Sequence, residues 1–468
     1  MNAVAMWGVH RLGTKPRGQE TVVPVIGTLA LATAATITFL VAGGVWMFYR
    51  RWHSSSMSDK ELSIFPEGTQ YAADFEVASI WFSLAVVASA FVIPIIWSLC
   101  TQSVVLGAMS RQRRLAIMRL LGLSASDITK IALFESGVQA SIAVLLGGGV
   151  SYLTLPVFTQ LQFQGRNVEI IELILPWWSY VGIAFSIVLL ALWSTYSSLR
   201  RVRIHPLGVS RREPEKSSSW VEIVIVVALF VAAKLAPEPD ANIMFLALVG
   251  LIVVVNAGIF WAFGPMLLRV VASVAVKLPG NANVVGWNRV FANPRQAWKS
   301  SAPAAFFGLL IGYLLLVPQP GTDFGDKNLD ALSRLGLWVD VATGVKLTVI
   351  FGLVLTGVSI FLQQANSIVE SAGSERELQH LGVKTNFHLQ VAIVSVLGPM
   401  MIFSVMGALI SGGMGLVTAF DSYDWRQASD NWGLFGWLIA MWGVSFAAVL
   451  LAEPFRRMEM SQDVRRKD

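Results

Sequence analysis

The chain has 468 residues, of which 55% are hydrophobic and only 14% are charged. Soluble domains carry about 25% charged residues, so this composition excludes an ordinary soluble enzyme or nucleic-acid-binding protein. The net charge of +6 comes from Lys and Arg between apolar segments, where it first indicates membrane topology. The single cysteine, Cys100, excludes an intramolecular disulfide.

Ten apolar segments are candidates for membrane-spanning helices, because about 20 apolar residues cross a hydrocarbon core of about 30 Å. The sequence therefore predicts an all-α integral membrane protein. The first segment has no convincing cleavage site, and we expect it to remain as a span. In chain order the predicted spans are Val22–Phe48, Val77–Ala108, Ile131–Leu155, Pro176–Ser198, Trp220–Leu235, Ile243–Leu268, Ala302–Val317, Leu337–Leu362, Phe387–Met414 and Leu434–Leu451.

The distribution of basic residues predicts the orientation of these spans. With the N-terminus inside, most of the 35 Lys and Arg residues lie on the cytoplasmic side, as the positive-inside rule requires. We therefore expect a multi-pass protein of the cell membrane with both termini in the cytoplasm. The outer loops are short, and the longest, Tyr49–Glu76, is where an extracellular partner could bind.

Three sequence features occur in the same order in both halves of the chain. An Arg-x4-Pro-Arg pattern precedes the first and seventh spans, a Leu-Gly pair precedes the third and ninth, and a basic pair ends the fourth and follows the tenth. Six spans separate equivalent helices, so the two halves have the same orientation. We predict two parallel four-helix units, residues 1–212 and 276–468, joined by two extra spans in residues 213–275.

The segment Ser110–Lys130, between the second and third spans, combines charge with an apolar stripe. Its basic residues are Arg111, Arg113, Arg114 and Arg119. These charges alone could contact anionic lipid headgroups. However, Leu115, Met118 and Leu121 lie three residues apart and form one face of a helix, which favours docking of a cytoplasmic protein. Gly122 is predicted to end this helix with a positive φ.

The stretch from Arg114 to Ser124 resembles the motif of the FtsX-like permease family, the membrane subunits of type VII (MacB-like) ABC transporters. Arg114 stands where the family has an acidic residue. A second, degenerate copy lies between Glu375 and Lys384. The resemblance assigns ATPase docking to Arg111, Arg114, Leu115, Met118, Arg119, Leu121, Gly122 and Ser124 in the first copy and to Glu377, Leu381 and Gly382 in the second.

The resemblance implies a permease subunit surrounded by membrane lipid and driven by a separate cytoplasmic ABC ATPase in two copies, which would hold ATP and Mg²⁺. The expected activity is export, or extraction from the membrane, of an amphipathic peptide, lipid or drug. One alternative is a non-transporting complex that transmits force to cell-wall enzymes outside. Another is an ion-coupled carrier or channel.

No pattern in the chain indicates catalysis, a cofactor, a metal site or nucleic-acid binding. Gly8-x4-Gly13-Thr14-Lys15 reverses the Lys and hydroxyl order of a phosphate-binding loop. His380 and His388 lack a carboxylate at metal-ligand spacing. An ion-coupled carrier needs ionisable residues at membrane depth. The few candidates are Glu135, Glu222, Lys234 and Lys346.

The predicted topology can be tested with introduced cysteines and an impermeant thiol reagent. A reaction from outside intact cells is expected for Ser55→Cys, Asn167→Cys, Asp326→Cys and Ser429→Cys. A reaction only after permeabilisation is expected for Ser126→Cys, Ser217→Cys, Asn283→Cys and Ser461→Cys. Labelling of Ser217→Cys from outside would contradict the predicted number of spans in the first half.

Overall fold

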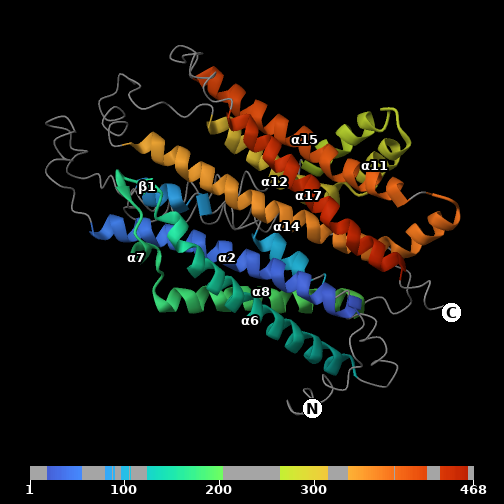
Figure 1. Cartoon of the computed structure of the whole chain (residues 1–468), viewed down its shortest axis with the longest axis horizontal. Coiled ribbons are helices and arrows are strands. Elements are labelled where there is room, and N and C mark those ends of the chain that lie inside the picture. The colour runs from blue at the N-terminus through green and yellow to red at the C-terminus, as the bar shows by residue number, and fades with distance from the viewer. Residues whose placement is uncertain are drawn as a thin grey trace, which may run out of the picture.

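The computed structural model describes residues 18–54, 80–86, 88–89, 96–104, 106, 124–203, 264–314, 336–383, 385–418 and 433–461. These residues form long helices that pack side by side in an elongated bundle (Figure 1). The labelled helices are α2 (Gly18–Ser54), α6 (Ala125–Phe158), α7 (Ile170–Leu173), α8 (Trp177–Arg203), α11 (Asn281–Ala292), α12 (Pro294–Leu314), α14 (Leu337–His380), α15 (Thr385–Thr418) and α17 (Gly433–Ser461). Further helical residues lie between 80 and 106 and at 264–275. Strands β1 (Gln162–Phe163) and β2 (Arg166–Asn167) pair antiparallel.

Six of the described helices are long and apolar enough to cross a membrane, which confirms the predicted class. They correspond to the predicted first, third, fourth, eighth, ninth and tenth spans. Shorter apolar helices at Ser300–Gly312 and Gly264–Ala275 cover most of the predicted seventh span and the end of the sixth. The predicted fifth span lies outside the described residues, and the second is described only in parts. The total of ten spans stays a prediction.

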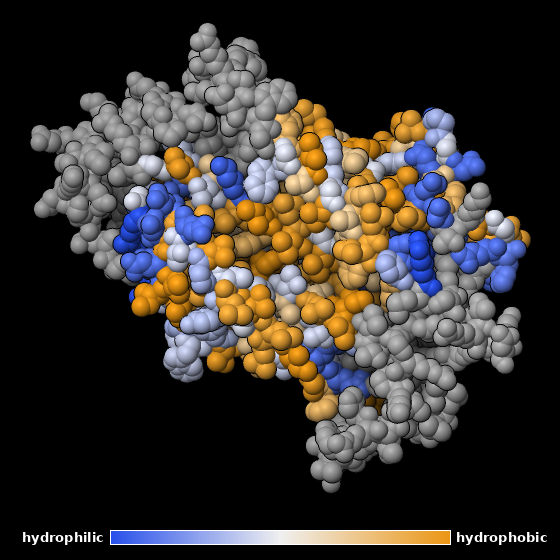
Figure 2. All heavy atoms as spheres, in the orientation of Figure 1, coloured by the Kyte–Doolittle hydropathy of each residue, from blue (hydrophilic) through white to orange (hydrophobic). Residues whose placement is uncertain are grey.

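The molecular surface has the polarity expected of a membrane protein. Figure 2 shows a broad hydrophobic band across the middle of the bundle, with hydrophilic residues gathered toward both ends of the helices. Large apolar side chains on α6 and α8 are exposed; Leu145, Leu153 and Trp193 are examples. In a soluble protein such a patch would be a site of aggregation. Here its position along the helices fits contact with lipid.

Hydrogen bonds between helices establish their relative directions. Gln139 donates to the Pro24 carbonyl at 3.2 Å, and Thr36 donates to the Gly147 carbonyl at 3.2 Å, so α2 and α6 run parallel. The chain must therefore cross back between Ser54 and Ala125. The helical residues between 80 and 106 lie in that stretch, as the predicted second span requires.

The second half contains an equivalent parallel pair, α12 and α15. A Cβ atom added to Gly312 would lie 2.5 Å from the Ala408 carbonyl oxygen, and one added to Gly308 would meet the Ser404 carbonyl. α14 lies between these helices in sequence and runs in the opposite direction, as Figure 1 shows. Figure 1 also shows α17 running in the same direction as α14, so α12, α14, α15 and α17 alternate in direction.

Small residues allow the closest helix contacts in both halves. A Cβ atom on Gly147 of α6 would lie 2.7 Å from the Ala32 carbonyl oxygen of α2. A Cβ atom on Gly407 of α15 would meet the Ala305 carbonyl of α12. Packing between small residues is a main source of helix association in membranes, where lipid is as apolar as the side chains. These glycines therefore set the distance between each pair of parallel helices.

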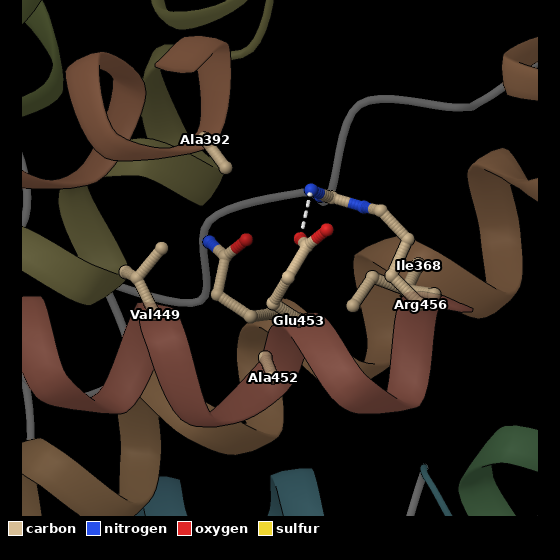
Figure 3. Close-up of a pocket in the computed structure, with 7 residues that line it drawn as sticks. Ile368, Ala392, Val449, Ala452, Glu453 and Arg456 are labelled. Carbon is tan, nitrogen blue, oxygen red and sulfur yellow. Dashed lines mark hydrogen bonds and ion pairs between the residues drawn. The ribbon is translucent and has the colours of Figure 1, made fainter. Parts of the chain in front are cut away.

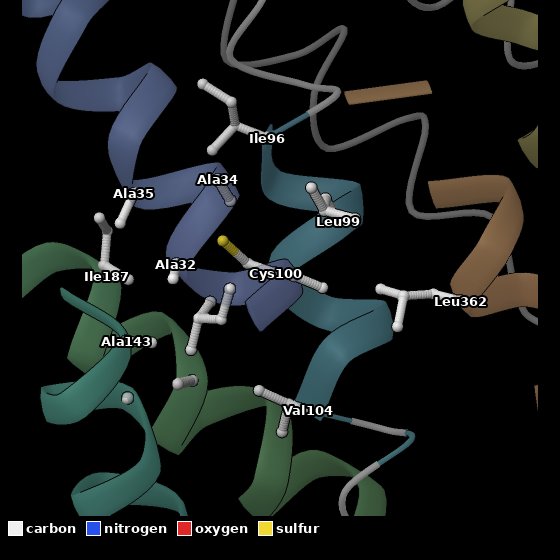
Figure 4. Close-up of a cluster of buried hydrophobic side chains, with 14 of the residues drawn as sticks. Ala32, Ala34, Ala35, Ile96, Leu99, Cys100, Val104, Ala143, Ile187 and Leu362 are labelled. Carbon is white, nitrogen blue, oxygen red and sulfur yellow. The ribbon is translucent and has the colours of Figure 1, made fainter. Parts of the chain in front are cut away.

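The largest buried cluster joins the two halves. Figure 4 shows Ala34 of α2, Cys100 of residues 96–104, Ala143 of α6 and Leu362 of α14 gathered in one core. α14 thus packs on the first half of the chain as well as on its own.

Substitution of the contact glycines should loosen the bundle. Because backbone atoms occupy the space, Gly147→Ala and Gly407→Ala should each lower stability by about 1–3 kcal/mol. Gly149→Ala on α6 and Gly412→Ala on α15 are matched controls, since nothing lies within 4 Å of either added Cβ. Thermal unfolding in detergent can be followed with a thiol-reactive dye, because Cys100 is buried. Equal melting temperatures for all four variants would contradict this packing.

Candidate docking surface and the charged clusters around it

The predicted second docking copy forms the tip of α14. This helix continues from the apolar segment Leu337–Ile368 to His380, and at about 1.5 Å per residue the extension is about 18 Å long. Leu378 and Leu381 at its end are 41% and 80% exposed, and Glu377 beside them is also exposed. The residues of the second docking copy are therefore accessible from outside the bundle.

The Leu381-Gly382 pair ends α14. Gly382 has a φ of 90°, a left-handed conformation that glycine adopts without steric cost. Its N–H donates to the Gln379 carbonyl at 2.9 Å, and the Val383 N–H donates to the Leu378 carbonyl at 3.1 Å. Together these two bonds form a Schellman motif. Gly382 therefore reverses the chain into α15 and leaves Leu381 at the exposed corner.

Most of the first docking copy lies outside the described residues, namely Arg111, Arg114, Leu115, Met118, Arg119, Leu121 and Gly122. Ser124 is described, and it is the N-cap of α6. Its hydroxyl accepts a hydrogen bond from the Asp127 N–H at 3.1 Å and donates to the Asp127 carboxylate at 2.7 Å. The third predicted span therefore begins directly after the docking segment. A docking role for either copy stays a prediction.

A buried cluster of three charges lies near the tip of α14. Arg456 of α17 is 4% exposed and forms ion pairs with Glu375 of α14 at 3.4 Å and with Glu453 at 3.0 Å. Ser371 donates to the other oxygen of Glu375 at 2.8 Å. Figure 3 shows Arg456 extended over Glu453, beside a narrow crevice lined by residues from α14, α15 and α17. After the predicted orientation of the chain, we call Glu375, Glu453 and Arg456 the inner charge cluster.

The inner charge cluster was not predicted from the sequence. Arg456 follows the last predicted span, which ends at Leu451, and was expected to be one of the cytoplasmic charges, whereas α17 continues to Ser461. The available signal was local: Glu453 and Arg456 lie three residues apart, the spacing of an ion pair along a helix.

A second buried cation, Arg51 of α2, lies near the other end of α14, where that helix begins. Arg51 of α2 is 1% exposed and donates to both oxygens of Glu172, to the Phe163 carbonyl at 2.9 Å and to the Asn167 carbonyl at 3.3 Å. Burial raises the pKa of Glu172, but the hydrogen bonds and positive charge of Arg51 outweigh it, so the pKa lies below its usual value. The predicted outer loop Tyr49–Glu76 thus begins inside α2.

The same region connects the two halves of the chain through the turn between β1 and β2. Gln164 and Gly165 have φ values of 56° and 70°, as in a two-residue type I′ hairpin. One carboxylate oxygen of Asp340 in α14 accepts hydrogen bonds from the Gln164 N–H at 2.8 Å and from the Trp81 indole at 2.7 Å. After the predicted orientation of the chain, we call Asp340 and Arg51 with these partners the outer junction.

The other titratable residues singled out from the sequence do not gather in the described part of the chain. Lys346 is exposed on α14 and Glu135 is half-buried on α6, while Glu222 and Lys234 lie outside the described residues. His380 is exposed and His388 is buried on α15. Among the described residues no group of His, Cys, Asp and Glu could hold a metal ion.

A comparison with protein families identifies part of the chain. Residues 86–207 match the family model described as FtsX-like permease C-terminal. This FtsX-like stretch covers about a quarter of the chain and includes residues 96–104, the first docking copy, α6, the hairpin and α8. The family comprises membrane subunits of transporters that typically work with a cytoplasmic ABC ATPase, so the match suggests an ABC transporter permease subunit. No curated protein and no solved structure matched.

The outer junction provides a matched test of buried charge. Arg51 and Arg166 both pair with Glu172, but Arg166 is 53% exposed. Arg51→Met should lower stability by about 3–5 kcal/mol because it leaves buried acceptors without their cation. Arg166→Met should cost about 0–1 kcal/mol. Thermal unfolding in detergent at pH 7 measures the stability change of each variant.

The pH dependence of the Arg51→Met effect has a defined sign. A lowered carboxyl pKa stabilises the folded state above the unfolded-state pKa, and this contribution is lost as the pH falls through the folded-state value. The difference between wild type and Arg51→Met should therefore shrink in acid. A difference that grows as the pH falls would contradict the assigned pairing.

Proposed function

We propose that this protein is the permease subunit of an ABC transporter in the cell membrane, with both termini in the cytoplasm. The FtsX-like match over residues 86–207 carries the proposal. The exposed tip of α14 supports it, because its Leu381-Gly382 pair repeats Leu121-Gly122 of the matched stretch. ATP and Mg²⁺ belong in this proposal to a separate cytoplasmic ATPase.

The proposal includes two FtsX-like units in one chain. Two observations on the described residues support this arrangement. The parallel pair α2 and α6 has its counterpart in α12 and α15, each held at a glycine. The glycines Gly147 and Gly407 also follow Gly122 and Gly382 at the same distance along the chain. A repeat inferred from the Leu-Gly pairs therefore recurs at the helix contacts.

Two units give two docking sites, and we assign one ATPase to each. In the first unit the site is the segment Arg111–Ser124, and in the second it is the tip from Glu377 to Gly382. ATP binding would bring the two ATPases together and favour one arrangement of the units, and hydrolysis would favour the other. Such coupling requires that the ATPases make different contact free energies in the two arrangements.

The polar contacts between the two units suggest which interactions change when the units rearrange. Gln102 of the first half and Ser359 of α14 hydrogen-bond at 3.0 Å within the apolar part of the bundle. At the outer junction, Trp81 of the first half donates a hydrogen bond to Asp340 of α14. In a membrane such polar contacts are broken only when new partners are found. We assign the cargo to an amphipathic peptide, lipid or drug, which could enter from the membrane when these contacts open.

Force transmission without transport is the second candidate function. One observation favours it: the hairpin of β1 and β2 is tied to both α2 and α14 through Arg51 and Asp340. Movement of α14 would therefore reach the outer surface directly. An exporter should hydrolyse ATP faster when cargo is present, whereas a force transmitter should respond to an extracellular protein. An ion-coupled carrier would do neither.

Variants of the two docking copies test the proposal. Burying a leucine at an interface is worth about 1.5–3 kcal/mol, whereas an exposed ion pair contributes about 0–1 kcal/mol. Leu121→Asp should therefore release the ATPase that copurifies with the wild-type chain, and Arg113→Ala should retain it. Leu381→Asp should have the same effect in weaker form, because the second copy has lost most of the motif.

Affinity capture of the coexpressed ATPase measures how strongly each of these variants weakens ATPase binding. If the basic residues only contact lipid, Leu121→Asp will retain the ATPase and loss of Arg111, Arg113 and Arg114 will impair membrane insertion. That reversed order would overturn the proposed docking.

A further inference from the structure

The exposed tip of α14 needs a support, because a helix that projects from the bundle can transmit force only if its base is held. Glu375 lies two residues before Glu377, on the last turns of the helix. It is buried although its neighbours at the tip are exposed. Its partner across the helix interface is Arg456 of α17.

Arg456 is fixed from its own helix as well as from α14. Glu453, three residues earlier on α17, accepts a hydrogen bond from Arg456 Nη1 at 3.0 Å. On the other side Arg456 Nε stands 3.4 Å from Glu375 Oε2, and neither atom has a hydrogen-bond partner in the described part of the chain. The contact within α17 is thus a directional hydrogen bond, and the contact with α14 is held by charge.

We infer that Arg456 is the positioning residue that couples the docking tip of α14 to α17. The inference rests on the proposed function, since it names how the second unit would receive force from an ATPase. A pull on the tip acts on Glu375, and the charge contact transfers it to Arg456, which belongs to α17. Glu453 keeps the Arg456 side chain in place for this contact. Because the contact between Arg456 and Glu375 lacks hydrogen-bond geometry, its length can change while the hydrogen bond between Arg456 and Glu453 stays intact.

The neighbouring residue Arg457 is a matched control. It has the same charge and pairs with the same Glu453, at 3.7 Å, but it is 71% exposed and no contact joins it to Glu375 in the described residues. Arg456→Met and Arg457→Met therefore remove the same charge from adjacent positions, and only the first removes the link to α14.

Amide hydrogen exchange of the purified chain in nanodiscs tests the link itself. Arg456→Met leaves Glu375 buried without its cation, so exchange across residues 369–382 should rise at least about tenfold. In Arg457→Met, the exchange rate of the same residues should stay within about twofold of wild type. Arg456→Lys should restore part of the protection. If Arg456→Met does not fold, Glu375→Gln is the milder variant, since it can keep its hydrogen bond with Ser371.

A second measurement tests coupling with the ATPase that copurifies with the wild-type chain. The Arg456→Met chain should still capture this ATPase, because its docking leucines are unchanged. However, activation of ATP hydrolysis by the permease, relative to the ATPase alone, should fall about tenfold. The Arg457→Met complex should hydrolyse ATP at the wild-type rate.

The outcomes separate this inference from the proposed function. Unchanged exchange in Arg456→Met, with ATPase still captured by the wild type, would overturn the positioning role alone. Increased exchange with full activation of hydrolysis would also overturn it. If the wild-type chain captures no ATPase while Arg456→Met still exchanges faster, the proposed function fails and the coupling role fails with it, although the contact between α14 and α17 stands.

Discussion

Two arginines are buried at opposite ends of α14, and the charges around them hold the bundle together. Arg51 is surrounded by Glu172 and two backbone carbonyls of the hairpin, and Arg456 by two carboxylates. A charge in an apolar protein interior costs several kcal/mol unless it is paired, and removal of one partner leaves that cost unpaid. The elements that carry these partners are therefore constrained to stay together. α14 takes part at both ends, through Glu375 at one and, at the other, through Asp340, which binds the same hairpin as Arg51.

Between the two charged ends, close packing of small residues determines the arrangement. Because lipid is as apolar as leucine, helices in a membrane associate through van der Waals contact and not through exclusion of water. Gly147 and Gly407 let carbonyl oxygens of the neighbouring helices approach closely. Each half thus forms a firm parallel pair, while α14 packs on both. The long helix is the element through which a change at the inner end would reach the outer junction.

The sequence allowed the membrane-spanning helices to be predicted because their length depends on the thickness of the bilayer, a property outside the protein. The turn at Gly382 was predictable from its counterpart Gly122, since a Leu-Gly pair at a helix end carries a local conformational preference. Arg456 was misplaced for a physical reason: the positive-inside rule counts basic residues near span ends without regard to burial. No local pattern indicates the pairing of Arg51 with Glu172 or of Trp81 with Asp340, because the partners are far apart in sequence.

The central proposal is a two-unit permease driven from the cytoplasm at two docking sites. Native mass spectrometry of the complex, extracted with ATP and Mg²⁺ from the membrane in which it is made, tests this most directly. The account predicts one permease chain with two copies of a cytoplasmic ATPase, and no nucleotide on the permease alone. A chain that carries stoichiometric ATP by itself, or that is never found with an ATPase, would contradict it.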